Sequence, residues 1–124
     1  MRRIAAVLTA AGILAGATAH AAGEPLEWWP DLPELTETDR TLAKTTGRVD
    51  MTGKPVGTVL AWQNPESGNS GTVELTEYLK WQGNDCRRLI HEFRIVGKRA
   101  ERVEFVTCRM ADGSWKWPVP PKRL

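Results

Sequence analysis

Apolar and polar residues alternate over much of the second half of the chain, and a repeat of two predicts β-strands. The alternation is cleanest over 72–81, where it predicts one buried and one polar face. The predicted buried face carries Val73, Leu75, Leu79 and Trp81, and the polar face carries Thr72, Glu74, Thr76 and Lys80. This segment is therefore expected to be a half-buried strand in a sheet with one solvated side.

Other short segments, separated by turn residues, are also predicted to be strands. They are 56–62, 87–96, 101–110 and 114–117. The stretch 64–71 (Asn-Pro-Glu-Ser-Gly-Asn-Ser-Gly) is dense in turn residues and is predicted to be a loop. The turn residues Gly97 and Lys98 predict a hairpin between the strands on either side of them. Strands joined by such short turns predict an antiparallel sheet.

A single helix is predicted, over residues 35–49. Thr36 followed three residues later by Asp39 is a weak form of the capping box that begins many helices, and Gly47 is expected to end this one. The predicted apolar face is thin and consists of Leu42 and Ala43, with Leu35 and Val49 at its edges. The expected fold is α+β, a small antiparallel β-sheet of four to five strands with one N-terminal helix packed on one face.

The amino terminus has the three parts of a secretory signal peptide, predicted to be residues 1–21. Arg2 and Arg3 precede an apolar run over 4–17, and Ala-His-Ala at 19–21 predicts cleavage before Ala22. The run is shorter than the roughly 20 residues that a transmembrane helix needs, and no second apolar run exists. Because the first cysteine is Cys86, no lipid-accepting cysteine follows the leader. We therefore expect export to the periplasm, with no transmembrane segment in the mature chain.

The leader is followed by a proline- and tryptophan-rich linker or strap over 22–34. The domain itself is predicted over 35–117, and 118–124 is expected to be an extended and partly loose tail. Without Arg2 and Arg3 the basic and acidic residues balance, so the basic isoelectric point of the whole chain indicates no nucleic-acid partner. Six acids precede Arg40, the first base after the leader, and the bases are in excess from Lys80 onward.

Cys86 and Cys108 are predicted to form a disulfide, because an exported chain with two cysteines most simply pairs them. Two unpaired thiols are the alternative. A metal site is not expected, since the two thiols and His91 fall short of four ligands. No cofactor is expected either.

The hairpin register can be predicted from the same pair. If Cys86 faces Cys108, then Leu89 faces Phe105 and His91 faces Val103. The buried face of the hairpin then carries Leu89, Phe93, Val103 and Phe105, and the opposite face carries Arg88, Glu92 and Arg102. A register set by a four-residue loop at 97–100 would place Glu92 against Phe105 and separate the cysteines, so it is rejected.

Several short motifs follow one another in a distinctive order. Trp-Gln-Asn-Pro-Glu-Ser-Gly-Asn-Ser-Gly at 62–71 precedes Gly83, the Cys-Arg pairs at 86–87 and 108–109, Gly97, and Asp-Gly at 112–113 before Trp115. This series resembles the carboxy-terminal domain of the bacterial 17 kDa outer-membrane surface antigens, over roughly 35–117. The resemblance implies a small antiparallel sheet with a helix and a place in the bacterial envelope. The chain departs from that family in lacking both the lipid-accepting cysteine and the glycine-rich apolar segment that many members carry.

Six tryptophans and an excess of arginine in the hairpin are the candidate binding chemistry. The candidate binding surface consists of Arg99, Arg102, Trp115, Trp117, Trp28 and Trp29. Packing of the tryptophans and cross-strand pairing of the arginines are the alternative. Trp115 and Trp117, two apart on a strand, are expected to share a face. His91 has no nucleophile or orienting acid nominated beside it, so no catalytic residue is predicted.

These patterns favour a non-enzymatic, exported cell-envelope protein that binds an envelope component or another envelope protein. A docking subunit of an envelope or secretion assembly is the alternative. A hydrolase of an envelope polymer is disfavoured, because the sequence nominates no carboxylate pair, triad or metal site.

Overall fold

The computed structural model describes residues 32–124. The predicted leader, most of the strap, and both Trp28 and Trp29 lie outside the described residues. None of the helices in the described part has the length and hydropathy needed to cross a membrane.

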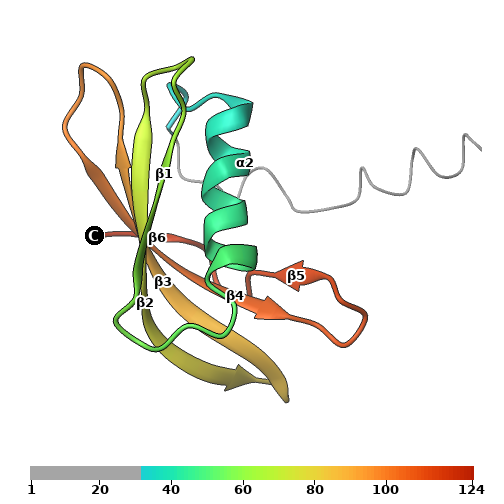
Figure 1. Cartoon of the computed structure of the whole chain (residues 1–124). Coiled ribbons are helices and arrows are strands. Elements are labelled where there is room, and N and C mark those ends of the chain that lie inside the picture. Colours follow the sequence, from blue (N-terminus) through green and yellow to red (C-terminus); the bar gives the residue numbers. More distant parts are fainter. Residues whose placement is uncertain (1–31) are drawn as a thin grey trace, which may run out of the picture.

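One helical segment packs on one face of a curled antiparallel sheet, as predicted (Figure 1). The strand order is β1-β2-β3-β4-β5, and β6 also pairs with β4. The helical elements are α2 (Glu37–Thr45) and the π-helical turn η2 (Thr46–Asp50). The strands are β1 (Val59–Gln63), β2 (Ser70–Trp81), β3 (Asn84–Arg94), β4 (Glu101–Arg109), β5 (Trp115–Lys116) and β6 (Lys122–Arg123).

The helix begins with the predicted capping box. Asp39 donates its backbone N–H to Thr36 Oγ1 at 3.0 Å, and Thr36 N–H donates to Asp39 Oδ2 at 2.8 Å. Gly47 does not end the helix as expected, because the chain continues through η2 to Asp50. A Cβ at Gly47 would lie 3.1 Å from Leu89 Cδ1, so glycine allows the helix to approach β3 closely. Val49 is exposed rather than at the edge of the core.

The predicted hairpin register is confirmed. Cys86 pairs with Cys108, Leu89 with Phe105, His91 with Val103, and Glu92 with Arg102. The two cysteines form a disulfide. The helix-facing side of the hairpin is buried, and it carries Leu89, Phe93, Val103 and Phe105. The disulfide lies on the other face of the sheet, because Cys86 and Cys108 have the opposite parity.

The predicted single apolar face of β2 is wrong, because a β-bulge lies between Leu75 and Glu77. Before the bulge, Leu75 pairs with Leu89 on the helix side; beyond it, Leu79 pairs with Cys86 on the outer side. The bulge inserts one residue and so reverses the side-chain alternation. Leu79 and Trp81 therefore leave the main core and pack against a second group, which we call the disulfide cluster. Its members are Cys86, Val106, Cys108, Leu79, Trp81 and Met110.

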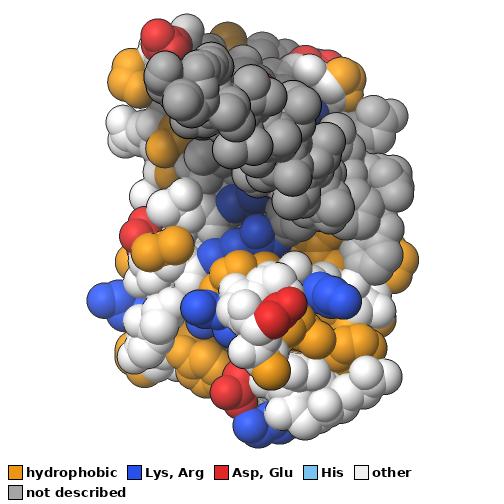
Figure 2. All heavy atoms as spheres, turned by 90° about the vertical axis from the view of Figure 1, so that its right-hand side faces the viewer, with side chains coloured by type: hydrophobic (Ala, Val, Ile, Leu, Met, Phe, Trp, Pro, Cys, Tyr) orange, Lys and Arg blue, Asp and Glu red, His pale blue; other side chains and the backbone are white. Residues whose placement is uncertain are grey.

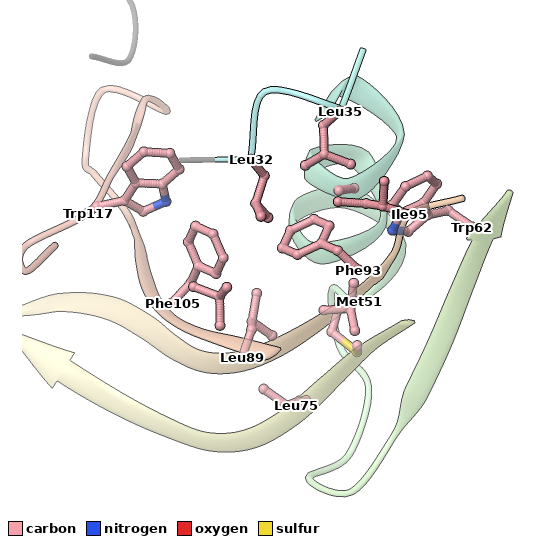
Figure 3. Close-up of a cluster of buried hydrophobic side chains, with 13 residues drawn as sticks. Leu32, Leu35, Met51, Trp62, Leu75, Leu89, Phe93, Ile95, Phe105 and Trp117 are labelled. Atoms are coloured by element: carbon pink, nitrogen blue, oxygen red, sulfur yellow. The ribbon is translucent and has the colours of Figure 1, made fainter. Parts of the chain in front are cut away.

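The main core fills the space between the helix and the concave side of the sheet (Figure 3). Leu35, Ala43 and Met51 come from the helical layer, and the other members come from the sheet and the segments beside it. The remaining buried members are Leu32, Trp62, Val73, Leu75, Leu89, Phe93, Ile95, Val103, Phe105 and Trp117. Leu32, which the sequence predicts to belong to the strap, is part of the core.

The carboxy-terminal tail is held to the edge of the sheet. Its two-residue strand β6 pairs with β4, with Arg123 opposite Val103 and Lys122 opposite Glu104. Leu124 N–H donates to the Arg102 carbonyl oxygen at 3.0 Å, and Arg123 Nη1 bonds Glu101 Oε1 at 3.1 Å. Both β5 and β6 therefore lie along the same edge of β4.

Candidate functional site

Three arginine side chains converge on the indole ring of Trp115. The guanidinium carbons of Arg87, Arg109 and Arg48 lie 5.2, 5.3 and 5.7 Å from the ring centroid. These distances are within the range of a cation–π contact. We call Trp115 and these three arginines the Trp115 cluster. Figure 2 shows Lys and Arg side chains gathered at the middle of the face that carries the helix and β5.

Four different elements position this cluster. Trp115 of β5 pairs with Arg109 of β4 in the sheet register, which places the two side chains on the same side. Arg48 comes from η2, and its guanidinium carbon lies 5.7 Å from the centroids of both Trp115 and Trp117. The two tryptophans therefore share the helix-facing side, as predicted.

Arg87 of β3 has a second role, at the carboxyl end of the helix. Its Nη1 donates to the carbonyl oxygen of Gly47 at 3.0 Å and to that of Arg48 at 3.4 Å. Carbonyls in the last turn of a helix lack partners within the helix and carry partial negative charge, so a guanidinium is favourable there. Arg87 thus fixes the position of the helix relative to β3 and reaches Trp115 at the same time.

The electrostatic character of the cluster is cationic. Burial lowers the pKa of Arg87, Tyr78 raises it, and the nearby charge of Arg109 lowers it further. Burial lowers the pKa of Arg48 to about 10, so both arginines stay protonated at neutral pH. Within residues 32–124, neither Arg87 nor Arg109 has an ion-pair partner. The arrangement can therefore receive an anionic group beside a flat aromatic surface.

A small cavity lies inward of the Trp115 cluster, between the helix and the sheet. Its volume is about 20 Å³, which is room for one water molecule. Two of its lining residues, His91 and Thr107, each carry a polar atom, Nδ1 and Oγ1, that is buried without a hydrogen-bond partner among the described residues. The cavity is lined by Ala43, Lys44, Gly47, Arg48, Leu89, His91, Phe105, Thr107 and Trp117.

His91 stacks on Phe93 and meets the edge of Phe105, with ring centroids 5.6 and 4.7 Å away. Burial, with a smaller contribution from the charge of Arg48, lowers the pKa of His91 from 6.5 to about 3. The imidazole is therefore neutral at neutral pH. Its environment is that of a core histidine.

The loop at 64–69 is tied to the helix through the buried carboxylate of Asp39. Asn64 Nδ2 and Ser67 Oγ each donate to Asp39 Oδ1 at 2.8 Å, and Asn69 Nδ2 donates to Oδ2 at 2.8 Å. Burial alone would raise the pKa of Asp39, but these bonds and the one from Thr36 outweigh it and lower the pKa to about 2. The polar residues of the Asn-Pro-Glu-Ser-Gly-Asn motif therefore have a structural role.

With this geometry established, comparison with known proteins gives a family. A family model described as the 17 kDa outer membrane surface antigen matches residues 51–116. This chain belongs to that family. The part of this chain that the surface antigen model matches contains Cys86, Arg87, Cys108, Arg109 and Trp115. Arg48 lies just before the matched part.

Curated relatives carry the same family name. The 17 kDa surface antigen of Rickettsia bellii strain RML369-C is 32% identical over 83 residues, which cover 66% of this chain and 52% of the relative. That of Rickettsia prowazekii strain Madrid E is 31% identical over 81 residues, which cover 64% of this chain and 50% of the relative. The chain spans about half the length of these surface antigens. No solved structure matches.

In this surface antigen domain, the predicted binding residues do not all lie together. Arg99 and Arg102 are exposed near the hairpin turn, whereas Trp115 pairs with Arg109 at the opposite end of β4. Arg102 and Arg109 are seven positions apart along β4, or about 23 Å. Trp117 is buried in the core against Phe105. Trp28 and Trp29 lie outside the described residues.

Sequence reasoning missed Arg48, and it counted Arg87 and Arg109 among the bases of the hairpin without grouping them with Trp115. Arg48 and Arg87 lie far apart in sequence, and no local pattern pairs them with Trp115. No group of three or more His, Cys, Asp or Glu side chains that could hold a metal occurs within 32–124.

Proposed function

We propose that this chain is an exported cell-envelope protein that binds an anionic component of the envelope without catalysing a reaction. We further propose that the Trp115 cluster is the contact surface, and that the protein works in the periplasm or in association with the outer membrane. The family name and the leader pattern at 1–21 support the location. The observation that carries the binding role is the convergence of three guanidiniums on one indole ring.

The physical basis of the proposed binding is charge held beside an aromatic surface. Burial is the main cause that lowers the pKa of Arg87, and the charge of Arg109 lies close enough to lower it further. An anion placed between these two side chains would relieve that repulsion and accept charge-assisted hydrogen bonds. Arginine and tryptophan are also the residues that most often dominate binding energy at interfaces.

A binding role is better supported than a hydrolytic one. His91, the one histidine in the described region, is buried and neutral at neutral pH, with aromatic rings stacked on it. General acid–base catalysis needs a titratable group within reach of a substrate proton, and His91 offers no such access.

The test compares two charge-matched double variants. Arg109→Glu with Lys116→Glu changes the end of the sheet that holds the Trp115 cluster, and Arg99→Glu with Arg102→Glu changes the hairpin turn by the same charge. We expect the first pair to lose retention in washed envelope fractions and the second to keep it. Melting temperatures show whether each variant is folded. Retention lost through the second pair alone would move the contact surface to the hairpin turn, and retention unaffected by both would refute the proposal.

A further inference from the structure

Neighbouring residues at one end of the sheet place different chemistry on its two faces. On β3, Cys86 faces outward and Arg87 faces the helix side; on β4, Cys108 and Arg109 divide in the same way. On β5, Lys116 pairs with Cys108. The alternation of a strand requires this division. The disulfide cluster and the Trp115 cluster therefore lie back to back at the same end of the molecule.

The disulfide cluster has apolar side chains that are only partly covered. Cys86, Val106 and Cys108 are buried, whereas Leu79 and Trp81 remain half-exposed. Met110, which directly follows β4, is also half-exposed. The bulge in β2 produces this arrangement, because it turns Leu79 and Trp81 away from the main core. Half-exposed tryptophan and methionine at a strand end are suited to a boundary between water and an apolar phase.

At the end of the sheet that carries the two clusters, basic side chains outnumber acidic ones. Lys80 is bonded to Asp85, and Asp112 accepts hydrogen bonds from the side chain and backbone N–H of Ser114. Arg87 and Arg109 have no ion-pair partner in the described part of the chain, and Lys116 forms no ion pair there, although its charge helps to lower the pKa of Asp112. A flat anionic surface would meet this excess of positive charge with complementary charge.

From this juxtaposition we propose that the end of the sheet carrying both clusters docks on an anionic lipid bilayer. Arg109 and Lys116 contact the headgroups, and Trp81 and Met110 enter the boundary between headgroups and acyl chains. This inference rests on the proposed function and names the envelope component. Basic residues attract a protein to anionic lipid, and apolar side chains that enter the interface strengthen that attachment.

The experiment measures binding of the full chain, expressed with its own leader and purified, to two kinds of vesicle. One contains phosphatidylglycerol and phosphatidylethanolamine, and the other contains phosphatidylcholine alone. We expect at least tenfold tighter binding to the anionic vesicles, falling as salt is raised. Arg109→Glu with Lys116→Glu should weaken it at least tenfold, because each base near such a surface contributes about fivefold. Arg99→Glu with Arg102→Glu is the charge-matched control and should change binding less than twofold.

The contribution of apolar side chains to vesicle binding is tested with one variant and one matched control. Met110→Gln should weaken binding to the anionic vesicles about threefold, including at high salt, where charge contributes least. Val59→Gln also replaces an exposed apolar residue, but on β1 at the far edge of the sheet, and should leave binding unchanged. If Met110→Gln lowers the melting temperature markedly, Leu79→Gln replaces it as the test variant.

The two proposals can fail separately. One outcome is that the Arg109→Glu, Lys116→Glu variant is no longer retained in envelope fractions, but the unaltered protein does not bind anionic vesicles. The lipid inference is then overturned, and the partner is an envelope protein or glycan. Equal binding to both vesicle types, or equal loss with the control pair, also overturns it. If the Arg109→Glu, Lys116→Glu variant keeps both its retention in envelope fractions and its binding to vesicles, both proposals are overturned.

Discussion

Asn69 donates a hydrogen bond from Nδ2 to Asp39 Oδ2 at 2.8 Å, across thirty positions of sequence. The bond joins the loop before β2 to the first turn of the helix. The same Asn69 accepts a bond at Oδ1 from the backbone N–H of Val96 at 3.0 Å, which extends the connection to the end of β3. One amide side chain thus holds three parts of the fold together.

Replacement of Asp39 by alanine is expected to destabilise the protein by about 3 kcal/mol or more. The change leaves the buried amides of Asn64 and Asn69 without their acceptor, and each unsatisfied buried group costs about 1–3 kcal/mol. Denaturant unfolding measures the loss. Glu37→Ala, in the same turn but exposed, is the control and should cost less than about 1 kcal/mol; an equally small effect at Asp39 would contradict the structural role of the network.

Stability is expected to fall as the pH is lowered from about 6.5 toward 3. His91 is neutral in the folded protein because its pKa is lowered to about 3, whereas the unfolded chain binds a proton near pH 6.5. The unfolded state therefore gains protons first, and the free energy of unfolding decreases by at most about 1.4 kcal/mol per pH unit. Urea unfolding between pH 4.5 and 7 measures the slope.

The matched variant for this slope is His91→Gln, which does not titrate. Its stability should change less between pH 4.5 and 7 than that of the unaltered protein. Asp39 does not interfere, because its pKa is lowered to about 2 and its stabilising charge is lost only below about pH 4. Identical slopes in both proteins would show that His91 is accessible to protons in the folded state.

Reduction of the Cys86–Cys108 bond is expected to lower the free energy of unfolding by about 3 kcal/mol. The two cysteines are separated by 22 positions, and a crosslink of this size restricts the unfolded chain by about that amount. For a domain near 100 residues, the melting temperature should fall by more than about 10 °C. Thermal unfolding with and without reductant measures it, and Cys86→Ala with Cys108→Ala should match the reduced protein.

Two glycines are expected to respond differently to alanine. A Cβ at Gly71 would lie 2.6 Å from the Glu92 carbonyl oxygen, so the backbone of β3 would have to move. At Gly47 the close neighbours are the side chains of Leu89 and His91, and alanine favours the helix by about 1 kcal/mol. Gly71→Ala should therefore destabilise the protein by about 1–3 kcal/mol. Gly47→Ala should be near neutral, and the reverse order in thermal unfolding would be inconsistent with this packing.

The hairpin and the start of the helix could be predicted because their determinants are local. The positions of Cys86 and Cys108, together with the alternation of apolar residues, select one register. The capping box of Thr36 and Asp39 selects the first turn of the helix. In both places, the segments that interact follow one another directly along the chain.

The site could not be predicted in the same way, because it depends on where elements meet. The bulge after Leu75 moves Leu79 to the outer face, and nothing in the alternation of 72–81 marks that position. Arg87 reaches the end of the helix forty positions away, so its contact with Gly47 has no local signature. For Trp117 the sequence left surface binding and core packing open, and the structure shows it buried against Phe105.

The position of β5 and β6 along one side of β4 also bears on self-association. A strand edge left open offers its backbone N–H and carbonyl groups to another copy of the chain, which is a route to polymers and aggregates. Here β5 and β6 occupy both ends of that edge. Removal of residues 122–124 would uncover one end of it, so the tendency of the protein to polymerise is expected to depend on this short strand.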